Sequence, residues 1–101
     1  MKSVIEGHYY ELENFEDFTK KGQGLQFIHK EVQNGEFVTV SDGTTNEEVL
    51  EVLIDRMAYL QKKFPCKENA IVITNLEESL MWLNKRTADR AKRGVEGKHE
   101  K

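Results

Sequence analysis

Apolar side chains recur every three or four residues in two long segments of the chain, one on each side of Pro65. In the first segment these positions are Leu50, Leu53, Ile54, Met57, Leu60 and Phe64, and in the second they are Ala70, Ile73, Leu76, Leu80, Leu83 and Thr87. This spacing follows the helical period of about 3.6 residues and places each set on one face. The pattern therefore predicts two amphipathic helices that fold back on each other as a hairpin.

Sequence signals mark both ends of each predicted helix. Thr45 and the glutamate three residues later are spaced as in a capping box, in which two side chains bond the backbone N–H groups at a helix start. Pro65 ends the first helix, because a proline pushes the residue before it out of helical geometry. The second helix is expected to begin near Lys67 or Glu68 and to end before Gly94, since glycine suits the turn that closes a helix.

The N-terminal part of the chain predicts β-structure. Residues 25–32 and 36–40 are rich in strand-forming side chains and flank Asn34-Gly35, the pair that best tolerates positive φ at both centres of a type I′ turn. These residues are predicted to form a β-hairpin. Residues 1–12 are expected to add a short strand.

Between the predicted strands, residues 13–24 are charged and carry two phenylalanines three residues apart, Phe15 and Phe18. This segment predicts either a single helical turn or an ordered loop that is anchored by the two rings.

The predicted fold class is α+β: a short antiparallel β-sheet, built on the N-terminal hairpin, packed with a C-terminal antiparallel hairpin of two helices. All 101 residues are expected to form a single domain. Its parts are β-rich residues 1–43, the helical hairpin at residues 44–94, and a tail at residues 95–101 that is disordered unless a ligand or partner holds it.

An oligomer is also expected. A chain this short buries a smaller share of its surface than a larger protein does. Ile71, Val72 and Trp82 lie off the main apolar face of the second helix. A helix with apolar residues on more than one face usually contacts a second partner, either a sheet or another subunit.

Composition favours a cytoplasmic protein without a cofactor. No apolar segment is long enough to span a membrane, and the first 12 residues lack the apolar core of a secretion signal. The single cysteine, Cys66, has no disulfide partner and is expected to be a buried or half-buried small apolar residue in a turn. The three histidines have no cysteine or carboxylate at metal-ligand spacing, so metal binding is not indicated. No phosphate loop, nucleophile motif or acid–base pair indicates an enzyme.

The net charge of −3 hides an asymmetry along the chain. Residues 1–55 have a balance of −8, residues 56–84 of +1, and residues 85–101 of +4. Within the basic end, Arg86, Arg90 and Arg93 are four and three residues apart, so a helix stacks them on one face. Such a row of guanidinium groups suits a pyrophosphate or phosphodiester. The alternative is a solvated helix end whose cations only complement the helix dipole.

Tyr59 lies on the flank of the first helix, outside its apolar stripe. Together with an amide such as Asn69, an exposed aromatic ring suits stacking on a nucleobase while the amide reads the base edge. The alternative for Tyr59 is an interface residue with an apolar ring and a polar tip.

The helical part of the chain resembles the phage-encoded Thoeris anti-defence sponge family, which shares a hairpin domain with the anti-CBASS sponges. The resemblance lies in two segments, DGTTNEEVLEVLIDR and FPCKENAIVITNLEESLMWLNKRTADRAKRGVEG. It covers roughly residues 25–97, and its most specific parts are the KEN turn, LEESLMWL and RTADRAKRGVEG.

This resemblance implies a non-enzymatic protein that binds cyclic nucleotide immune signals of the bacterial host and leaves them intact. The implied ligands are glycocyclic ADP-ribose signals of Thoeris and, for some members, cyclic di- or trinucleotides of CBASS. The implied assembly is a homodimer or a hexamer built as a trimer of dimers, with neither membrane nor long nucleic acid as a partner. By motif position, Tyr59 stacks on the adenine, while Asn69, Arg86 and Arg90 surround the ribose and phosphates.

Two other functions compete with sequestration. The basic end of the second helix also suits a small nucleic-acid-binding or regulatory module, which would show a steep salt dependence. The apolar residues off the main helical face also suit a structural oligomerisation protein of a phage particle, which would form large assemblies without a small ligand.

Overall fold

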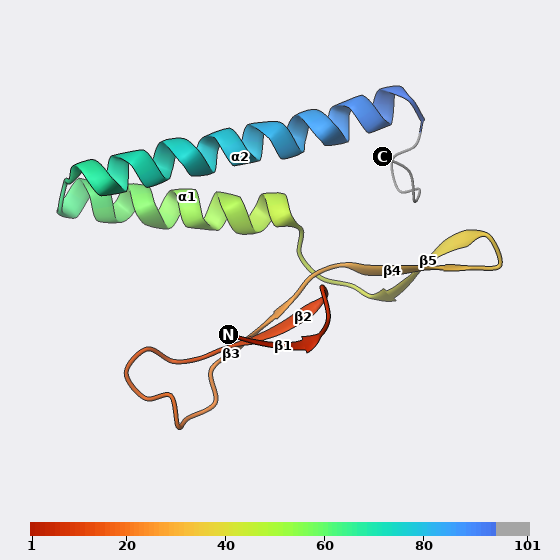
Figure 1. Ribbon diagram of the computed structural model, residues 1–101, viewed down its shortest axis with the longest axis horizontal. Helices are drawn as coiled ribbons and strands as arrows, with labels where there is room; N and C mark the ends of the chain where they lie inside the picture. The colour runs from red at the N-terminus through yellow and green to blue at the C-terminus, as the bar shows by residue number, and fades with distance from the viewer. Residues whose placement is uncertain (95–101) are drawn as a thin grey trace. The chain divides into compact units, whose positions relative to one another are not determined.

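The computed structural model describes residues 1–94 of the chain, which form two compact units (Figure 1). The first unit is Met1–Thr45, and the second begins at Asn46. The elements of the first unit are β1 (Lys2–Ile5), β2 (Tyr9–Leu12), β3 (Gln23–Gln26), β4 (His29–Gln33) and β5 (Glu36–Ser41), and those of the second are α1 (Asn46–Lys63) and α2 (Lys67–Lys92). The α+β class is therefore confirmed, whereas the single domain and the oligomer stay predictions. The predicted tail at residues 95–101 lies outside the described residues.

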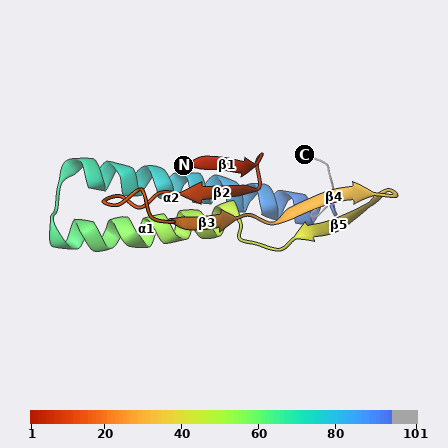
Figure 2. The ribbon, with the colours of Figure 1, turned by 90° about the horizontal axis from the view of Figure 1, so that it is seen from below.

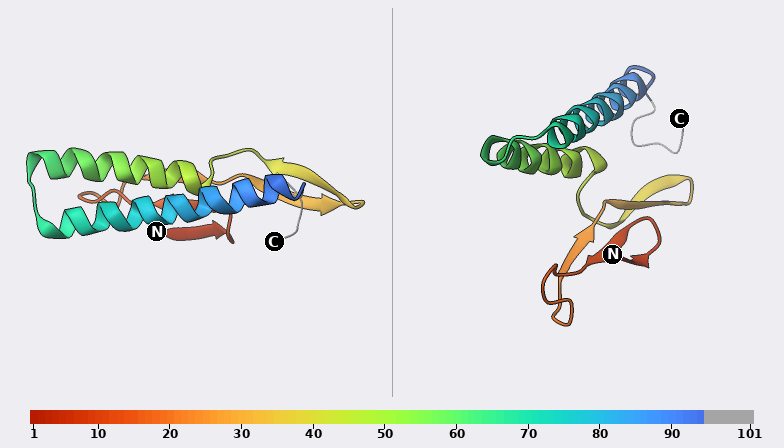
Figure 3. Two further views of the ribbon diagram at one scale, coloured as in Figure 1. Left: turned by 90° about the horizontal axis from the view of Figure 1, so that it is seen from above. Right: turned by 60° about the vertical axis from the view of Figure 1, so that its left-hand side comes forward.

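The second unit is the predicted antiparallel helical hairpin, as both views in Figure 3 show. Helix α1 has 18 residues and α2 has 26. At a rise of about 1.5 Å per residue, α2 is longer by roughly 12 Å. Since α1 ends and α2 begins at the same turn, the last two turns of α2 extend past the beginning of α1.

The connection between the helices is built by polar groups of residues 61–69. Helix α1 ends two residues before Pro65, as predicted. The Gln61 side chain bonds Cys66 twice: its Oε1 accepts from the backbone N–H, and its Nε2 donates to the carbonyl, both at 3.0 Å. Cys66 is the N-cap of α2, and its Sγ accepts a hydrogen bond from the backbone N–H of Asn69 at 3.4 Å. The prediction of a buried Cys66 is wrong, because the residue is exposed and serves as a cap.

The C-terminal end of α2 follows the sequence signal closely. Gly94 has a φ of 70°, and its N–H donates to the carbonyl of Ala91 at 3.1 Å. The N–H of Arg93 donates to the carbonyl of Asp89, also at 3.1 Å. A residue with positive φ at this position turns the chain back so that two terminal carbonyls are satisfied.

The first unit contains two antiparallel sheets: β1, β2 and β3 lie side by side in that order, and β4 pairs with β5 (Figure 2). Gly7, with a φ of 76°, allows the turn between β1 and β2. The turn between β4 and β5 contains Asn34 and Gly35 with φ of 53° and 80°, which confirms the predicted hairpin turn.

The strand predicted at residues 25–32 is divided between the two sheets. Residues 25 and 26 belong to β3 and pair with β2, whereas β4 begins at His29 and pairs with β5. The backbone N–H groups between them have other acceptors: that of Phe27 donates to the carbonyl of His8 at 2.8 Å, and that of Ile28 to the carbonyl of Thr44 at 2.9 Å. The rings of His8 and His29 also stack, with centroids 3.6 Å apart. Contacts with distant segments therefore interrupt the strand.

The loop at residues 13–22 is ordered by polar side chains and not by its aromatic rings. Asn14 Nδ2 donates to the carbonyls of Lys20 and Lys21 at 3.4 and 3.2 Å, and Asp17 Oδ1 accepts from the N–H of Thr19 at 3.1 Å. Phe15 and Phe18 are 99% and 72% exposed. The ordered-loop alternative is thus confirmed, but its predicted aromatic anchor is wrong.

Within residues 1–94 no apolar side chain is buried, and the one buried residue is Arg90. The residues on the predicted helical stripes between α1 and α2 are half-buried for the most part, including Ile54, Leu60, Ile73 and Leu76. Neither of the two helices in this part of the chain combines the length and apolar character needed to cross a membrane.

Replacing Cys66 tests its role as the N-cap of α2. Sulfur is a weak acceptor, and serine is among the best N-cap residues. We expect Cys66→Ser to raise the free energy of unfolding by about 0.5 kcal/mol and Cys66→Ala to lower it by a similar amount. Urea unfolding followed by circular dichroism, at one fixed protein concentration, measures both changes. Equal stability of the serine and alanine variants would contradict the capping role.

Candidate functional site

The four residues predicted to bind a ligand lie at opposite ends of the helical hairpin. Tyr59 is in the last turns of α1 and Asn69 in the first turn of α2, so both are next to the connecting turn. Arg86 and Arg90 are near the other end of α2. From the helical rise, Tyr59 and Arg86 are separated by roughly 20 Å along the hairpin. Within one chain, Tyr59 and Asn69 therefore lie at one end of the hairpin and the two arginines near the other.

Tyr59 lies in a shallow hollow on α1 with a volume of about 510 Å³. The residue is 53% exposed, and the ammonium group of Lys63 is 5.0 Å from the centroid of its ring. The other lining residues are Glu48, Glu51, Val52, Asp55 and Arg56. Three carboxylates against one guanidinium make this hollow acidic, so it suits an aromatic group better than a phosphate. We call it the acidic hollow.

Asn69 is half-buried beside the turn that joins the helices. Its backbone N–H is bonded to Cys66 Sγ, which fixes the first turn of α2 and therefore the place from which the side-chain amide projects. An amide carries both donors and an acceptor, so it can bond the edge of a base or a ribose hydroxyl.

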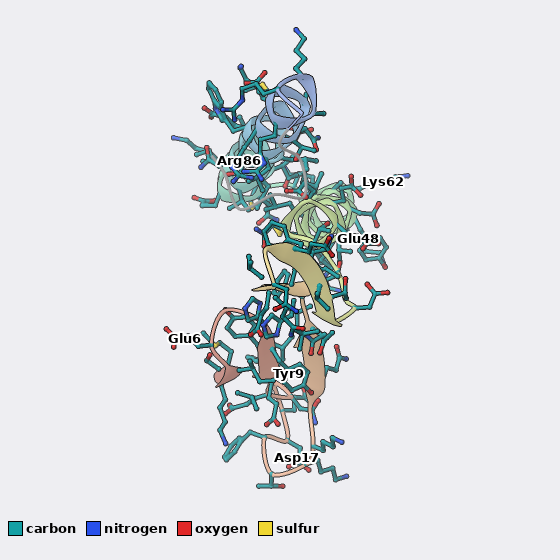
Figure 4. All side chains as sticks on the ribbon, turned by 90° about the vertical axis from the view of Figure 1, so that its right-hand side faces the viewer. Glu6, Tyr9, Asp17, Glu48, Lys62 and Arg86 are labelled. Carbon is teal, nitrogen blue, oxygen red and sulfur yellow. The ribbon has the colours of Figure 1, made fainter. Side chains whose placement is uncertain are left out.

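Arg86, which is labelled in Figure 4, is an exposed residue of α2. It lines a second hollow of about 240 Å³. Trp82, Lys85, Asp89 and Arg93 line the same hollow. Three cations against one carboxylate give this hollow a net positive charge. One of the cations is paired, since Lys85 Nζ lies 2.9 Å from Asp89 Oδ2. Guanidinium groups beside an indole ring suit a phosphate-bearing ligand with a flat ring. We call it the basic hollow.

The three arginines of the predicted row have different surroundings. Arg86 and Arg93 both line the basic hollow, whereas Arg90 is 8% exposed and is not part of that lining. Burial strengthens the hydrogen bonds of a guanidinium group because water competes less for them.

Sequence reasoning missed two neighbours of the predicted residues. Trp82 precedes Arg86 by four residues, and Lys63 follows Tyr59 by four, so the helical spacing places each pair on one face. The signal is therefore present in the sequence, in the four-residue spacing of each pair.

The arrangement contains groups for binding an anion and an aromatic ring. Among residues 1–94 no cluster of three histidine, cysteine or carboxylate side chains is placed to hold a metal ion. The titratable groups that line the two hollows are four carboxylates, three arginines, one lysine and one tyrosine.

Comparison with known proteins places the helical hairpin in a described family. Residues 24–88 match the family described as "Acb2/Tad1, hairpin domain". Tyr59, Asn69 and Arg86 lie inside the matched region, and Arg90 lies two residues beyond it. The chain is also similar to "Thoeris anti-defense 1" of Bacillus phage SBSphiJ7, with 56% identity over 62 residues. That match covers 60% of this chain and 44% of the relative, so the chain spans less than half the length of this relative.

Two arginines on the same helix provide a matched test of burial. Arg90→Ala is expected to lower the free energy of unfolding by about 1 to 3 kcal/mol, because it removes a buried stem and its hydrogen-bonding head. Arg86→Ala removes an exposed side chain and is expected to change the same quantity by less than about 0.5 kcal/mol. Urea unfolding of both variants measures the difference. Equal losses would show that the burial of Arg90 does not contribute to stability.

Proposed function

Because this chain belongs to the Acb2/Tad1 hairpin domain family, we propose that it is a phage anti-defence protein that binds and sequesters cyclic nucleotide immune signals. The observation that carries the proposal is the family match over the helical hairpin, which contains both hollows. Sequestration keeps the signal from its effector and needs no chemical step. The protein would act in the cytoplasm of the infected or lysogenic bacterium, where the signal is made.

The proposed ligand class is glycocyclic ADP-ribose, with cyclic di- or trinucleotides of CBASS as further ligands. Glycocyclic ADP-ribose has a flat adenine and a charged pyrophosphate, and the cyclic oligonucleotides have flat bases and phosphodiester groups. The acidic hollow around Tyr59 offers a ring and few cations, and the basic hollow around Arg86 offers cations. The two hollows therefore suit different ends of the same ligand.

We place the complete site between two copies of the chain. Tyr59 and Arg86 are separated by roughly 20 Å along one hairpin, which is too far for one small cyclic nucleotide to contact both. Two antiparallel copies would bring the acidic hollow of one chain next to the basic hollow of the other. Opposite charge balances favour this pairing over a parallel one. A homodimer, or a trimer of such dimers, supplies the arrangement.

The proposed role requires binding only. A trap has to hold its ligand tightly without stabilising a transition state, so a catalytic base or nucleophile would add nothing. Stacking on Tyr59 and charged hydrogen bonds from Arg86 would serve this purpose, with Asn69 bonding the ribose or the base edge. A ligand contact by Arg90 stays a prediction, because this side chain is buried and lies outside the lining of the basic hollow.

Arg86→Ala tests the proposed site with little effect on folding. Calorimetry with glycocyclic ADP-ribose isomers and cyclic oligonucleotides is expected to show tight binding to the unaltered protein, with the ligand recovered intact after denaturation. Arg86→Ala is expected to weaken binding at least about thirtyfold, because it removes a charged partner of the phosphates.

Lys62→Ala is the matched control for that experiment. Lys62 is an exposed cation of α1 that lines neither hollow, and Figure 4 shows it extending away from the helix. This variant should keep the affinity of the unaltered protein. Absence of binding of any cyclic nucleotide by the unaltered protein would reject sequestration. Equal affinity of the Arg86→Ala variant would show that the binding site does not include Arg86.

Mixing two inactive variants tests whether the site is shared between chains. If Tyr59 and Arg86 come from different copies, mixed dimers of Tyr59→Ala and Arg86→Ala chains contain one intact site and one doubly altered site. Random exchange across a two-fold interface should then restore about a quarter of the sites. Tyr59→Ala mixed with Asn69→Ala is the control and should restore none, because these residues lie at the same end of one hairpin. Absence of restoration in the first mixture would contradict a shared site.

The basic hollow also supports nucleic-acid binding as an alternative function. Trp82 with three neighbouring cations resembles a short stacking platform. The overall charge of −3 opposes that function on a polyanion. A gel shift with single-stranded and double-stranded DNA and RNA at moderate salt distinguishes the two functions.

A further inference from the structure

The first unit contains a cavity of about 480 Å³ between the three-stranded sheet and the loop at residues 13–22. This volume lies within the range of small-molecule pockets, about 300 to 1,000 Å³. Figure 4 shows Tyr9 on the strands and Asp17 in the loop beyond them. Most of the lining residues precede residue 24, where the family match begins. The cavity is therefore separate from the two hollows of the helical hairpin.

Two aromatic rings line this cavity. The ring of Tyr9 on β2 lies across Gly24 on β3: a Cβ atom at Gly24 would be 2.3 Å from the Tyr9 hydroxyl oxygen and 3.0 Å from Cε1. Glycine at this position thus lets the ring lie against the strand and form a flat wall. Phe18 contributes a second ring from the loop, and its exposure of 72% leaves most of that ring uncovered by the chain.

The charged residues of the lining favour an anion of low charge. Lys2, Lys20 and Lys21 contribute three ammonium groups, against the carboxylates of Glu11 and Glu13. Lys20 is shared with Asp17, whose Oδ2 is 3.9 Å from its Nζ, and exposed pairs of this kind are weak. The two glutamates would repel a triphosphate, whereas a single phosphate matches the small positive balance.

The loop is organised before any ligand arrives. The side-chain amide of Asn14 donates hydrogen bonds to the carbonyls of Lys20 and Lys21. The Asp17 carboxylate accepts from the backbone N–H of Thr19, and the Asp17 backbone carbonyl accepts from the N–H of Lys20 at 3.3 Å. The backbone that carries both lysines is therefore fixed by side chains that do not line the cavity. Binding then loses little entropy from ordering the loop.

We propose that this cavity binds a nucleoside monophosphate, with the base against the rings of Tyr9 and Phe18 and the phosphate among Lys2, Lys20 and Lys21. The flat base matches the two aromatic rings of the lining, and the single phosphate matches its lysine ammonium groups. The site is independent of the proposed cyclic nucleotide site, because its residues belong to the first unit and those of the other site to the second.

Calorimetry of the full chain with adenosine 5′-monophosphate tests the proposal, with adenosine and inorganic phosphate titrated separately. Phe18→Ala and Lys21→Gln are each expected to weaken binding of the monophosphate about tenfold, through lost stacking and a lost charge. Adenosine and phosphate alone should each bind at least about tenfold more weakly than the monophosphate.

The same loop and sheets supply matched controls. Phe15→Ala removes an exposed ring of the loop that does not line the cavity, and Lys30→Gln removes an exposed cation of β4 outside it. Both should bind the monophosphate as the unaltered protein does, and so should Arg86→Ala. No binding by the unaltered protein, equal losses for Phe15→Ala and Phe18→Ala, or loss of binding in Arg86→Ala would each overturn the proposal. A failure here leaves cyclic nucleotide binding, measured with its own ligands, unaffected.

Discussion

The exposure of the apolar side chains is the constraint on which the rest of this structure depends. Residues 1–94 contain no buried apolar side chain, while large ones such as Val52, Ile71 and Trp82 remain open on the helical hairpin. Burial of apolar surface contributes about 25 cal/mol per Å² and is the main favourable contribution to folding, whereas ordering each residue costs about 1 to 2 kcal/mol. A single chain, whose apolar stripes are only half-buried, therefore gains less of this free energy than a domain with a fully buried core. Association with further copies, as proposed for the binding site, would supply that burial, so folding and assembly would be one process.

The distribution of charge on the helical hairpin favours one relative orientation of the copies in the proposed assembly. The hollow around Tyr59 is acidic and the hollow around Arg86 is basic, and the two lie at opposite ends of the hairpin. Exposed charge pairs contribute little to stability, so apolar burial would hold the copies together and charge would select the antiparallel orientation. The same separation explains why one chain is unsuited to bind a small ligand with all four predicted residues.

The features that sequence predicted correctly depend on neighbouring residues, and those it missed depend on distant ones. Pro65, Gly94 and the Asn34-Gly35 turn act through their own backbone preferences, so the helix ends and the hairpin turn were predictable. The division of the strand at residues 25–32 depends on the carbonyls of His8 and Thr44, which are far away in sequence. For the site, spacing predicted Tyr59 outside the apolar stripe of α1, and the structure exposes this residue. Spacing also predicted one row of Arg86, Arg90 and Arg93, of which only Arg86 and Arg93 line the basic hollow. Spacing alone did not show that Arg90 is buried, since burial depends on tertiary structure.

A site shared between chains would couple capture of the ligand to assembly. A ligand that binds only the assembled form stabilises it by an amount that grows with ligand concentration, about 2.7 kcal/mol at one hundred times the dissociation constant. For a chain with no buried apolar side chain among its described residues, that amount is a large share of a typical stability of about 5 to 15 kcal/mol. Binding of the immune signal would then stabilise the assembled form that binds it. By the same linkage, diluting the protein would weaken ligand binding even with every contact residue intact, because dilution dissociates the assembled form. A site within one chain would not depend on protein concentration in this way.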